Sequence, residues 1–164
     1  MERRCRIGIT GRAGRAPLER KDKEMDHGIK GPLGDALAAK GYEALTAVQA
    51  AVLAYGVAGR DLLVSAQTGS GKTVAFGLAM APEILGTSEK LLYADVPLAL
   101  IIAPTRELAL QVARELEWLY ATAGARIATC VGGMDYRTEK RALERGAHIV
   151  VGTPGRLRDH IERR

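Results

Sequence analysis

Residues 66–73 read Ala66-Gln67-Thr68-Gly69-Ser70-Gly71-Lys72-Thr73, and the fold of the chain is best inferred from this segment. An apolar, strand-like segment precedes it at 61–65, and an Ala-rich helical pattern follows it at 74–81. Strand, glycine-rich turn, Lys-Thr and helix in this order predict a phosphate-binding loop. The glycines let backbone N–H groups turn inward, and the following helix directs the positive end of its dipole at the same anion.

We expect this loop to hold a nucleoside triphosphate. Lys72 can place a positive charge on the β- and γ-phosphates, and the Thr73 hydroxyl can ligate Mg²⁺, so both are candidate catalytic residues and Thr73 is the candidate metal ligand. A plain Gly-Ser turn is the structural alternative, but Lys-Thr at this offset after a strand argues against it. The residues expected to contact the nucleotide here are Ala66, Gln67, Thr68, Gly69, Ser70, Gly71, Lys72 and Thr73.

Composition divides the 164 residues into a tail and one domain. Residues 1–26 carry eight Lys or Arg against five Asp or Glu, which is much of the net charge of +5. We expect 1–30 to be a basic, disordered tail and 31–164 to form the nucleotide-binding domain. No apolar run approaches membrane length, and Cys5 and Cys130 lack metal-ligand spacing. These features predict a cytoplasmic protein without membrane association, with Cys130 in the core.

Apolar runs alternate with amphipathic stretches through most of the domain. Helical spacing begins at Leu33 and resumes at Val48 after an interruption at Lys40-Gly41. Strand-like runs follow at 61–65, 98–103, 126–131 and 148–151, with helical stretches at 74–85, 106–120 and 136–145. This alternation predicts an α/β fold with a parallel sheet covered by helices on both faces. Right-handed crossovers would gather the loops that follow the strands along one edge.

Three further polar loops leave the predicted strands at that edge. Thr105 is a good N-cap, and Arg106 in the first turn opposes the helix dipole, which suits a bound phosphate. The Gly132-Gly133 pair lets backbone N–H groups approach a phosphodiester, and 153–156 combines a Thr cap, a Pro at the first helical position and an Arg. Each loop alone would be ordinary structure. Together they suggest a surface that follows a sugar–phosphate backbone without reading bases.

These segments resemble, in order and spacing, the motifs of bacterial-type DEAD-box ATP-dependent RNA helicases. Residues 66–73 resemble motif I, 104–109 motif Ia, Gly132-Gly133 the GG motif, and 153–156 motif Ib. Residues 41–49 resemble the Q motif, so the resemblance implies that Gln49 selects adenine. It also implies a RecA-like P-loop NTPase domain that uses ATP and Mg²⁺. The residues that it places along the RNA backbone, without base specificity, are Pro104, Thr105, Arg106, Gly132, Gly133, Thr153, Gly155 and Arg156.

The sequence departs from that family in four respects. Leu45 and Ala47 stand where the Q motif usually has prolines, which loosens the loop without removing its chemistry. Pro32 stands where an aromatic residue is expected, so adenine stacking is expected to be weaker. No Asp-Glu-Ala-Asp run occurs, so we expect a domain that is incomplete at its C-terminus, with an exposed sheet edge. Residues 5–15 agree at nine of eleven positions with motif VI, a motif of the family's second domain. Arg12 aligns there with an arginine-finger position, although a flexible tail gives such a group little preorganisation.

Two functional hypotheses follow. The first is that this chain is the ATP-binding and RNA-backbone-binding half of a helicase that remodels RNA duplexes. The second is a non-catalytic nucleotide- or RNA-binding fragment with no hydrolysis of its own, since the carboxylates that hold the metal and orient the attacking water are not in the sequence. A different P-loop enzyme, such as a transporter ATPase, is disfavoured by 41–49 and 104–109. His148 and His160 have no partner at catalytic spacing.

Overall fold

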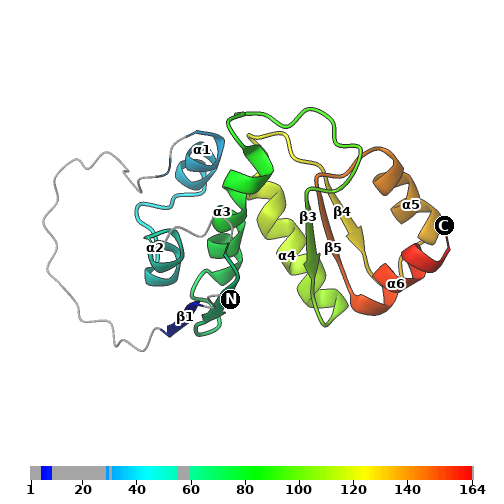
Figure 1. The fold of residues 1–164 in the computed structure, drawn as a ribbon, viewed down its shortest axis with the longest axis horizontal. Coiled ribbons are helices and arrows are strands. Elements are labelled where there is room, and N and C mark those ends of the chain that lie inside the picture. Colours follow the sequence, from blue (N-terminus) through cyan, green and yellow to red (C-terminus); the bar gives the residue numbers. More distant parts are fainter. Residues whose placement is uncertain (1–4, 9–28, 30, 55–59, 164) are drawn as a thin grey trace, which may run out of the picture.

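The computed structural model describes residues 5–8, 29, 31–54 and 60–163, and Figure 1 shows their arrangement. Two parallel sheets form the framework. The first pairs β1 (Cys5–Gly8) with β2 (Leu62–Ser65), and the second has the order β3 (Ala99–Ile102), β5 (Ile149–Gly152), β4 (Ile127–Cys130). The four strands expected from the sequence are therefore present. Three are shorter than their apolar runs because the flanking residues enter the loops, and β5 has the expected length but begins one residue later.

Six helices connect and cover the described strands: α1 (Pro32–Ala39), α2 (Ala47–Ala54), α3 (Lys72–Leu85), α4 (Arg106–Leu119), α5 (Tyr136–Glu144) and α6 (Pro154–Glu162). Local sequence sets where they begin. The Thr105 hydroxyl accepts the Leu108 N–H at 3.3 Å, which confirms the expected N-cap of α4. Asp135 caps α5 by accepting the N–H groups of Arg137 and Thr138.

Both faces of the three-stranded sheet are covered, as the alternating pattern predicts. Ile149 and Val151 of the central strand pack with α3 and α4 in the main core, whereas Val150 packs with Ala142 of α5 and Leu157 of α6. All four residues of β5 are buried, as expected for a strand between two others. In Figure 1, α4 lies between α3 and this sheet, and α5 and α6 lie beyond it.

Two aromatic contacts hold separate segments of the chain together, and Cys130 lies in the core, as the sequence predicts. The Tyr120 hydroxyl donates to the Gly77 carbonyl at 2.6 Å and is fully buried, which ties α4 to α3. Trp118 stacks on Tyr42 with ring centroids 5.9 Å apart. Cys130 is a buried free thiol, and burial raises its pKa to about 11, so it remains protonated at neutral pH.

The structure departs from the expected single sheet. Among the described strands, β2 pairs only with β1 and β3 pairs only with β5, so the sheet is divided between β2 and β3. Because β3 has a partner on one side only among the described strands, its other edge is open, which agrees with the predicted exposed edge. Leu63, Leu100 and Ile102 on these strands are each 59% exposed. Side-chain packing of α3 on α4 connects the two parts, because α3 follows β2 and α4 packs against β4 and β5.

The N-terminal tail contains one element that composition does not predict. Cys5–Gly8 forms β1, which pairs in parallel with β2 in the register Cys5 opposite Leu62 and Gly8 opposite Ser65. This pairing provides hydrogen-bond partners for backbone groups along one edge of β2. Composition alone does not predict it, because it depends on backbone groups and not on side-chain polarity. The rest of the motif VI-like segment, including Arg12, lies outside the described residues. No helix in the described ranges is both long and apolar enough to cross a membrane.

Candidate nucleotide and RNA-backbone site

The loop between β2 and α3 has the backbone conformation that its glycines allow. Gly69 and Gly71 have φ of 79° and 84°, a left-handed conformation that side chains with a β-carbon rarely adopt. Gly71 is the N-cap of α3, and no side chain caps that end of the helix. The first-turn N–H groups of a 14-residue helix are thus left for an anion, which is the arrangement expected of a phosphate loop.

Lys72 faces its own loop. Its ammonium group donates to the carbonyl oxygens of Ala66 and Gln67, each at 2.6 Å. Two of the three ammonium hydrogens are used in these bonds, and a phosphate entering the loop competes for them favourably because an anionic oxygen is a stronger acceptor for an ammonium group than a neutral carbonyl. The predicted role of Lys72 fits its position at the first turn of α3, with the side chain bent back over the loop.

Ser70 supplies a second observation that fits a phosphate. Its hydroxyl is buried and has no hydrogen-bond partner among the described residues, although buried hydroxyl groups are nearly always paired. Gly69 has open space where a β-carbon would stand, so the loop leaves room beside its backbone. An unpaired hydroxyl, an uncapped helix end and a lysine in one short loop form the donor set that a triphosphate needs.

Gln49 is placed differently from the expectation that it reads adenine. Its side chain is fully buried, its Oε1 accepts the Thr46 N–H at 2.9 Å, and its Nε2 donates to the Gly71 carbonyl at 3.4 Å. The Thr46 hydroxyl donates to the Ser70 carbonyl at 2.9 Å. In this arrangement the amide holds the phosphate loop against α2, and contact with adenine requires the amide to turn outward.

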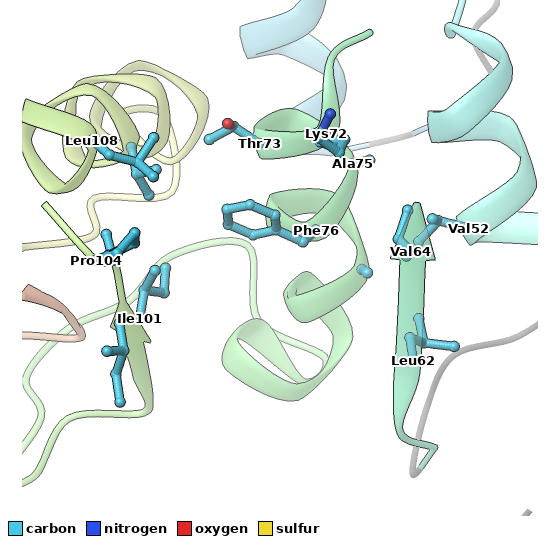
Figure 2. Close-up of a pocket in the computed structure, with 14 residues that line it drawn as sticks. Val52, Leu62, Val64, Lys72, Thr73, Ala75, Phe76, Ile101, Pro104 and Leu108 are labelled. Atoms are coloured by element: carbon cyan, nitrogen blue, oxygen red, sulfur yellow. The ribbon is translucent and has the colours of Figure 1, made fainter. Parts of the chain in front are cut away.

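A cavity of about 440 Å³ opens between the two sheets and reaches the start of α3. Figure 2 shows Phe76 of α3 projecting between β2, with Leu62 and Val64, and β3, with Ile101. Lys72, Thr73 and Pro104 line the same cavity. The nucleotide loop and the first predicted RNA loop therefore border one space, and Thr73 is among the residues that line it.

The predicted RNA-facing loops all leave the three-stranded sheet at the C-terminal ends of its strands. Arg106, after β3, reaches past β5 and donates through Nη1 to the carbonyl of Gly132, after β4. Gly132, Gly133 and Gly155 are exposed, and Gly133 has φ of 78°. The structure thus brings the three loops together, as the sequence predicts. Thr153 is at the N-cap position of α6, but its side chain makes no capping hydrogen bond, contrary to the expectation.

Arg156 turns into the protein. Its Nε donates to Oε2 of Glu139 at 2.7 Å and its Nη2 donates to the Met134 carbonyl at 2.9 Å. The hydrogen bond to Glu139 raises the pKa of the Arg156 guanidinium further above its usual range. The sequence led us to expect Arg156 along the RNA path. In this structure its side chain is only 13% exposed, so the guanidinium has no free face for an RNA backbone.

Sequence reasoning missed Glu139 and His160. Glu139 is a buried carboxylate on α5 that accepts the Val131 N–H at 3.0 Å, the Arg156 Nε, and the His160 Nε2 at 2.7 Å. Neither residue belongs to a pattern with a known chemical role, and an acidic residue on a charged helix usually faces water. The cluster becomes visible only in the folded chain, where α5 and α6 lie close enough for Glu139 to bind Arg156 and His160.

Comparison with known proteins gives this site a family. Residues 46–164 match the family model described as DEAD/DEAH box helicase. The DEAD-box ATP-dependent RNA helicase CshA of Bacillus licheniformis is 42% identical over 140 residues, which are 85% of this chain and 28% of that protein. The ATP-dependent RNA helicase DeaD of Klebsiella pneumoniae is 45% identical over 143 residues, 84% of this chain and 21% of that protein.

Solved structures agree. The RNA helicase Prp28 of Chaetomium thermophilum, bound to ADP, superimposes with a TM-score of 0.72 at 38% identity, covering 92% of this chain and 37% of that one. A hypothetical ATP-dependent RNA helicase of Sulfolobus tokodaii gives a TM-score of 0.68 at 30% identity and covers 80% of this chain and 36% of that one. The chain thus spans between a fifth and two fifths of the length of these proteins. The fold is that of a RecA-like helicase domain, and the chain belongs to the DEAD/DEAH box helicase family.

Proposed function

We propose that this chain is the ATP-binding, RNA-backbone-binding part of an ATP-dependent RNA helicase that remodels RNA duplexes. One observation carries the proposal: Lys72 and Thr73 of the phosphate loop line the same cavity as Pro104 of the first RNA loop. That loop is hydrogen-bonded through Arg106 to the Gly132-Gly133 loop. A nucleotide and an RNA backbone would therefore bind at neighbouring positions along the same edge of the domain.

The nucleotide is ATP with Mg²⁺ in this proposal. Residues 66–73 would hold the phosphates, with Lys72 released from the carbonyls of Ala66 and Gln67, and Thr73 would ligate the metal. Mg²⁺ would neutralise phosphate charge and hold the β- and γ-oxygens in place. Gln49 would select adenine after its amide leaves the loop, so the choice of ATP over GTP depends on a rearrangement that phosphate binding does not require.

The RNA would be held through its backbone. Pro104, Thr105, Arg106, Gly132, Gly133, Thr153 and Gly155 present backbone groups, hydroxyls and one guanidinium at the sheet edge, and contacts of this kind carry no base specificity. A cytoplasmic location fits a chain with a buried free cysteine and an RNA substrate.

Nucleotide binding is tested with a fluorescent ATP analogue in the presence of Mg²⁺. Lys72→Ala should weaken binding at least about tenfold, because a charge-assisted contact to phosphate is lost. Lys90→Ala is the matched control, since Lys90 is an exposed lysine away from the loop, and it should leave the affinity unchanged. Equal binding by both variants would overturn the assignment of residues 66–73 as the ATP site.

A second candidate function, a nucleotide- and RNA-binding fragment without hydrolysis, is favoured by the residues around Thr73. None of the described residues that line the cavity is acidic, so no carboxylate there completes a metal site. Phosphate release measured with and without RNA separates the two candidates. Turnover that disappears in Lys72→Ala establishes the enzyme, whereas ATP-analogue and RNA binding without turnover establishes the binding fragment.

A further inference from the structure

Glu139 is the most enclosed charged group near the proposed RNA surface. Its side chain is 1% exposed, and both oxygens have partners: Oε1 accepts the Val131 N–H, and Oε2 accepts from Arg156 and His160. Because an ionised carboxylate only accepts, the His160 Nε2 carries the hydrogen. Val131 is the residue directly before Gly132. The carboxylate therefore joins the start of the Gly132-Gly133 loop to α6.

Each nitrogen of the Arg156 guanidinium faces a group of the protein. Nε binds Glu139, Nη2 binds the Met134 carbonyl, Nη1 lies 3.8 Å from Asp159, and the group stands over the Tyr136 ring at 5.3 Å. The planar fork of an arginine suits such divided contacts, whereas an ammonium group cannot reproduce them. Arg156 thus fixes the far end of the loop at Met134, as Glu139 fixes its beginning at Val131.

Arg106 offers the contrast on the other side of the same loop. Its Nη1 donates to the Gly132 carbonyl, the side chain is half-buried, and no carboxylate among the described residues forms an ion pair with it. The charge of Arg106 is available to a phosphate, whereas that of Arg156 is matched by Glu139. Both arginines therefore hold the same loop, but only Arg106 has a positive charge that no carboxylate in the described part of the chain neutralises.

Attachment of α6 depends on the same cluster. None of the residues of α6 is fully buried, although Leu157 packs on the face of the sheet that carries Ala128 and Cys130. His160 stacks on Tyr136 with ring centroids 4.6 Å apart and binds Glu139. Loss of the carboxylate would free Arg156 and His160 together, and with them the orientation of the first turn of α6.

We propose that Glu139 and Arg156 are positioning residues for RNA binding. Glu139 sets the Gly132–Met134 loop and the N-terminal end of α6 in place through Val131 and Arg156, and neither side chain contacts RNA. This inference rests on the proposed function, because it assumes that the loop faces an RNA backbone. It differs from the sequence-based expectation, in which Arg156 itself meets a phosphate.

For Glu139→Gln, electrostatics and loop positioning predict opposite changes in RNA affinity. Glu139→Gln removes a negative charge near the RNA surface, so electrostatics alone would strengthen RNA binding. An amide in place of the carboxylate presents an N–H₂ group to Arg156 or loses the Val131 bond, so the positioning role requires weaker binding. The expected result is a loss of affinity of about tenfold, the scale of one disrupted set of contacts.

Salt dependence distinguishes a positioning arginine from a contacting one. Affinity for a labelled oligouridylate is measured by fluorescence anisotropy on the full chain between 50 and 200 mM NaCl. Loss of one phosphate contact lowers the slope of log affinity against log salt by about 0.7 for a single strand. We expect that change in Arg106→Gln. In Arg156→Gln and Glu139→Gln, affinity should fall while the slope stays unchanged.

Three further variants complete the test. Arg156→Lys keeps the charge but not the fork, and should lose as much affinity as Arg156→Gln. The double variant Glu139→Gln/Arg156→Gln should be within about twofold of either single variant, because both act through one cluster. Arg158→Gln is the matched control, since Arg158 is 76% exposed on the same helix and should change affinity by less than about twofold.

ATP-analogue binding at residues 66–73 shows that each variant remains folded, because that loop lies on the other sheet. If Glu139→Gln does not fold, the RNA affinities of Arg156→Lys and Arg156→Gln still show whether Arg156 acts through its shape or through its charge. Tighter RNA binding by Glu139→Gln, full binding by Arg156→Lys, or a reduced slope in Arg156→Gln would overturn this inference and leave the proposed function standing. Failure of the unsubstituted chain to bind RNA would overturn the proposed function and this inference with it.

Discussion

The amide of Gln49 lies where a side chain at Gly71 would have to be. A β-carbon added to Gly71 would stand 2.6 Å from Nε2 of Gln49, closer than van der Waals contact allows. The same amide donates to the Gly71 carbonyl. The shape of the phosphate loop therefore depends on a residue 22 positions earlier in the chain.

Gly71→Ala should consequently abolish ATP-analogue binding. The substitution puts a β-carbon into a left-handed conformation, which costs about 1–2 kcal/mol, and adds the clash with Gln49. Gly69→Ala is the control, because Gly69 has nearly the same φ but open space at that position. We expect a markedly smaller loss of affinity in Gly69→Ala. Equal losses would show that backbone strain, and not the contact with Gln49, governs the loop.

Tyr120→Phe should destabilise the domain by about 1 kcal/mol, the net contribution of one hydrogen bond. The phenol hydroxyl is buried and donates to Gly77, so its removal leaves an acceptor between α3 and α4 without this partner. Urea unfolding followed by circular dichroism measures the change. Tyr42→Phe is the matched control, since no hydrogen bond of the Tyr42 hydroxyl occurs among the described residues and its ring still stacks on Trp118.

His148 should make stability fall in mildly acidic solution. Burial and, second, the nearby Arg126 lower the pKa of its imidazole, and Nδ1 accepts the Arg126 N–H at 2.9 Å. Because the folded-state pKa lies below the unfolded value of about 6.5, the unfolded state binds a proton first as the pH falls. Stability is then lost below about pH 6.5 until the folded-state pKa is reached, by at most about 1.4 kcal/mol per pH unit.

His148→Asn tests this dependence, since its Oδ1 can replace Nδ1 as an acceptor without titrating. The free energy of unfolding is compared for both proteins at pH 7.5, 6.5 and 5.5. The difference between them should shift in favour of the variant as the pH falls. A difference that stays constant across this range would mean that His148 does not carry the loss.

The exposed edge strand should promote self-association. Leu100 is 59% exposed on β3, whose outer edge is unpaired in the described chain, and such edges accept strands from other molecules. Leu100→Lys should reduce the oligomer fraction in sedimentation velocity without lowering stability. Leu92→Lys changes an even more exposed leucine that lies outside any strand, so it should have little effect. The opposite ranking of the two variants would place the association surface in the loop around Leu92.

Local patterns predicted the phosphate loop and the strands, because each depends on residues close in sequence. The convergence of the RNA-facing loops was predicted from a general rule of topology, that parallel strands joined by right-handed crossovers end at one edge of the sheet. Contacts between distant segments were not predictable in this way. The Gln49 amide was expected to read adenine but is occupied by Thr46 and Gly71, and Arg156 was expected on the surface but is bound to Glu139. Both cases involve polar side chains whose partners are chosen by tertiary packing. The division of the sheet likewise depends on which strands meet, which periodicity does not specify.

The divided sheet has a consequence for communication between ligands. The phosphate loop follows β2, the RNA-facing loops follow β3, β4 and β5, and no backbone hydrogen bond among the described residues joins the two sheets. A movement at one loop therefore reaches the others through side-chain packing, chiefly the packing of α3 against α4. At Gly77 the two helices leave no room for a side chain, because a β-carbon there would stand 2.7 Å from a methyl group of Leu119 and 3.0 Å from one of Leu116. The coupling free energy between the two ligands therefore depends on how easily α3 moves relative to α4 at Gly77.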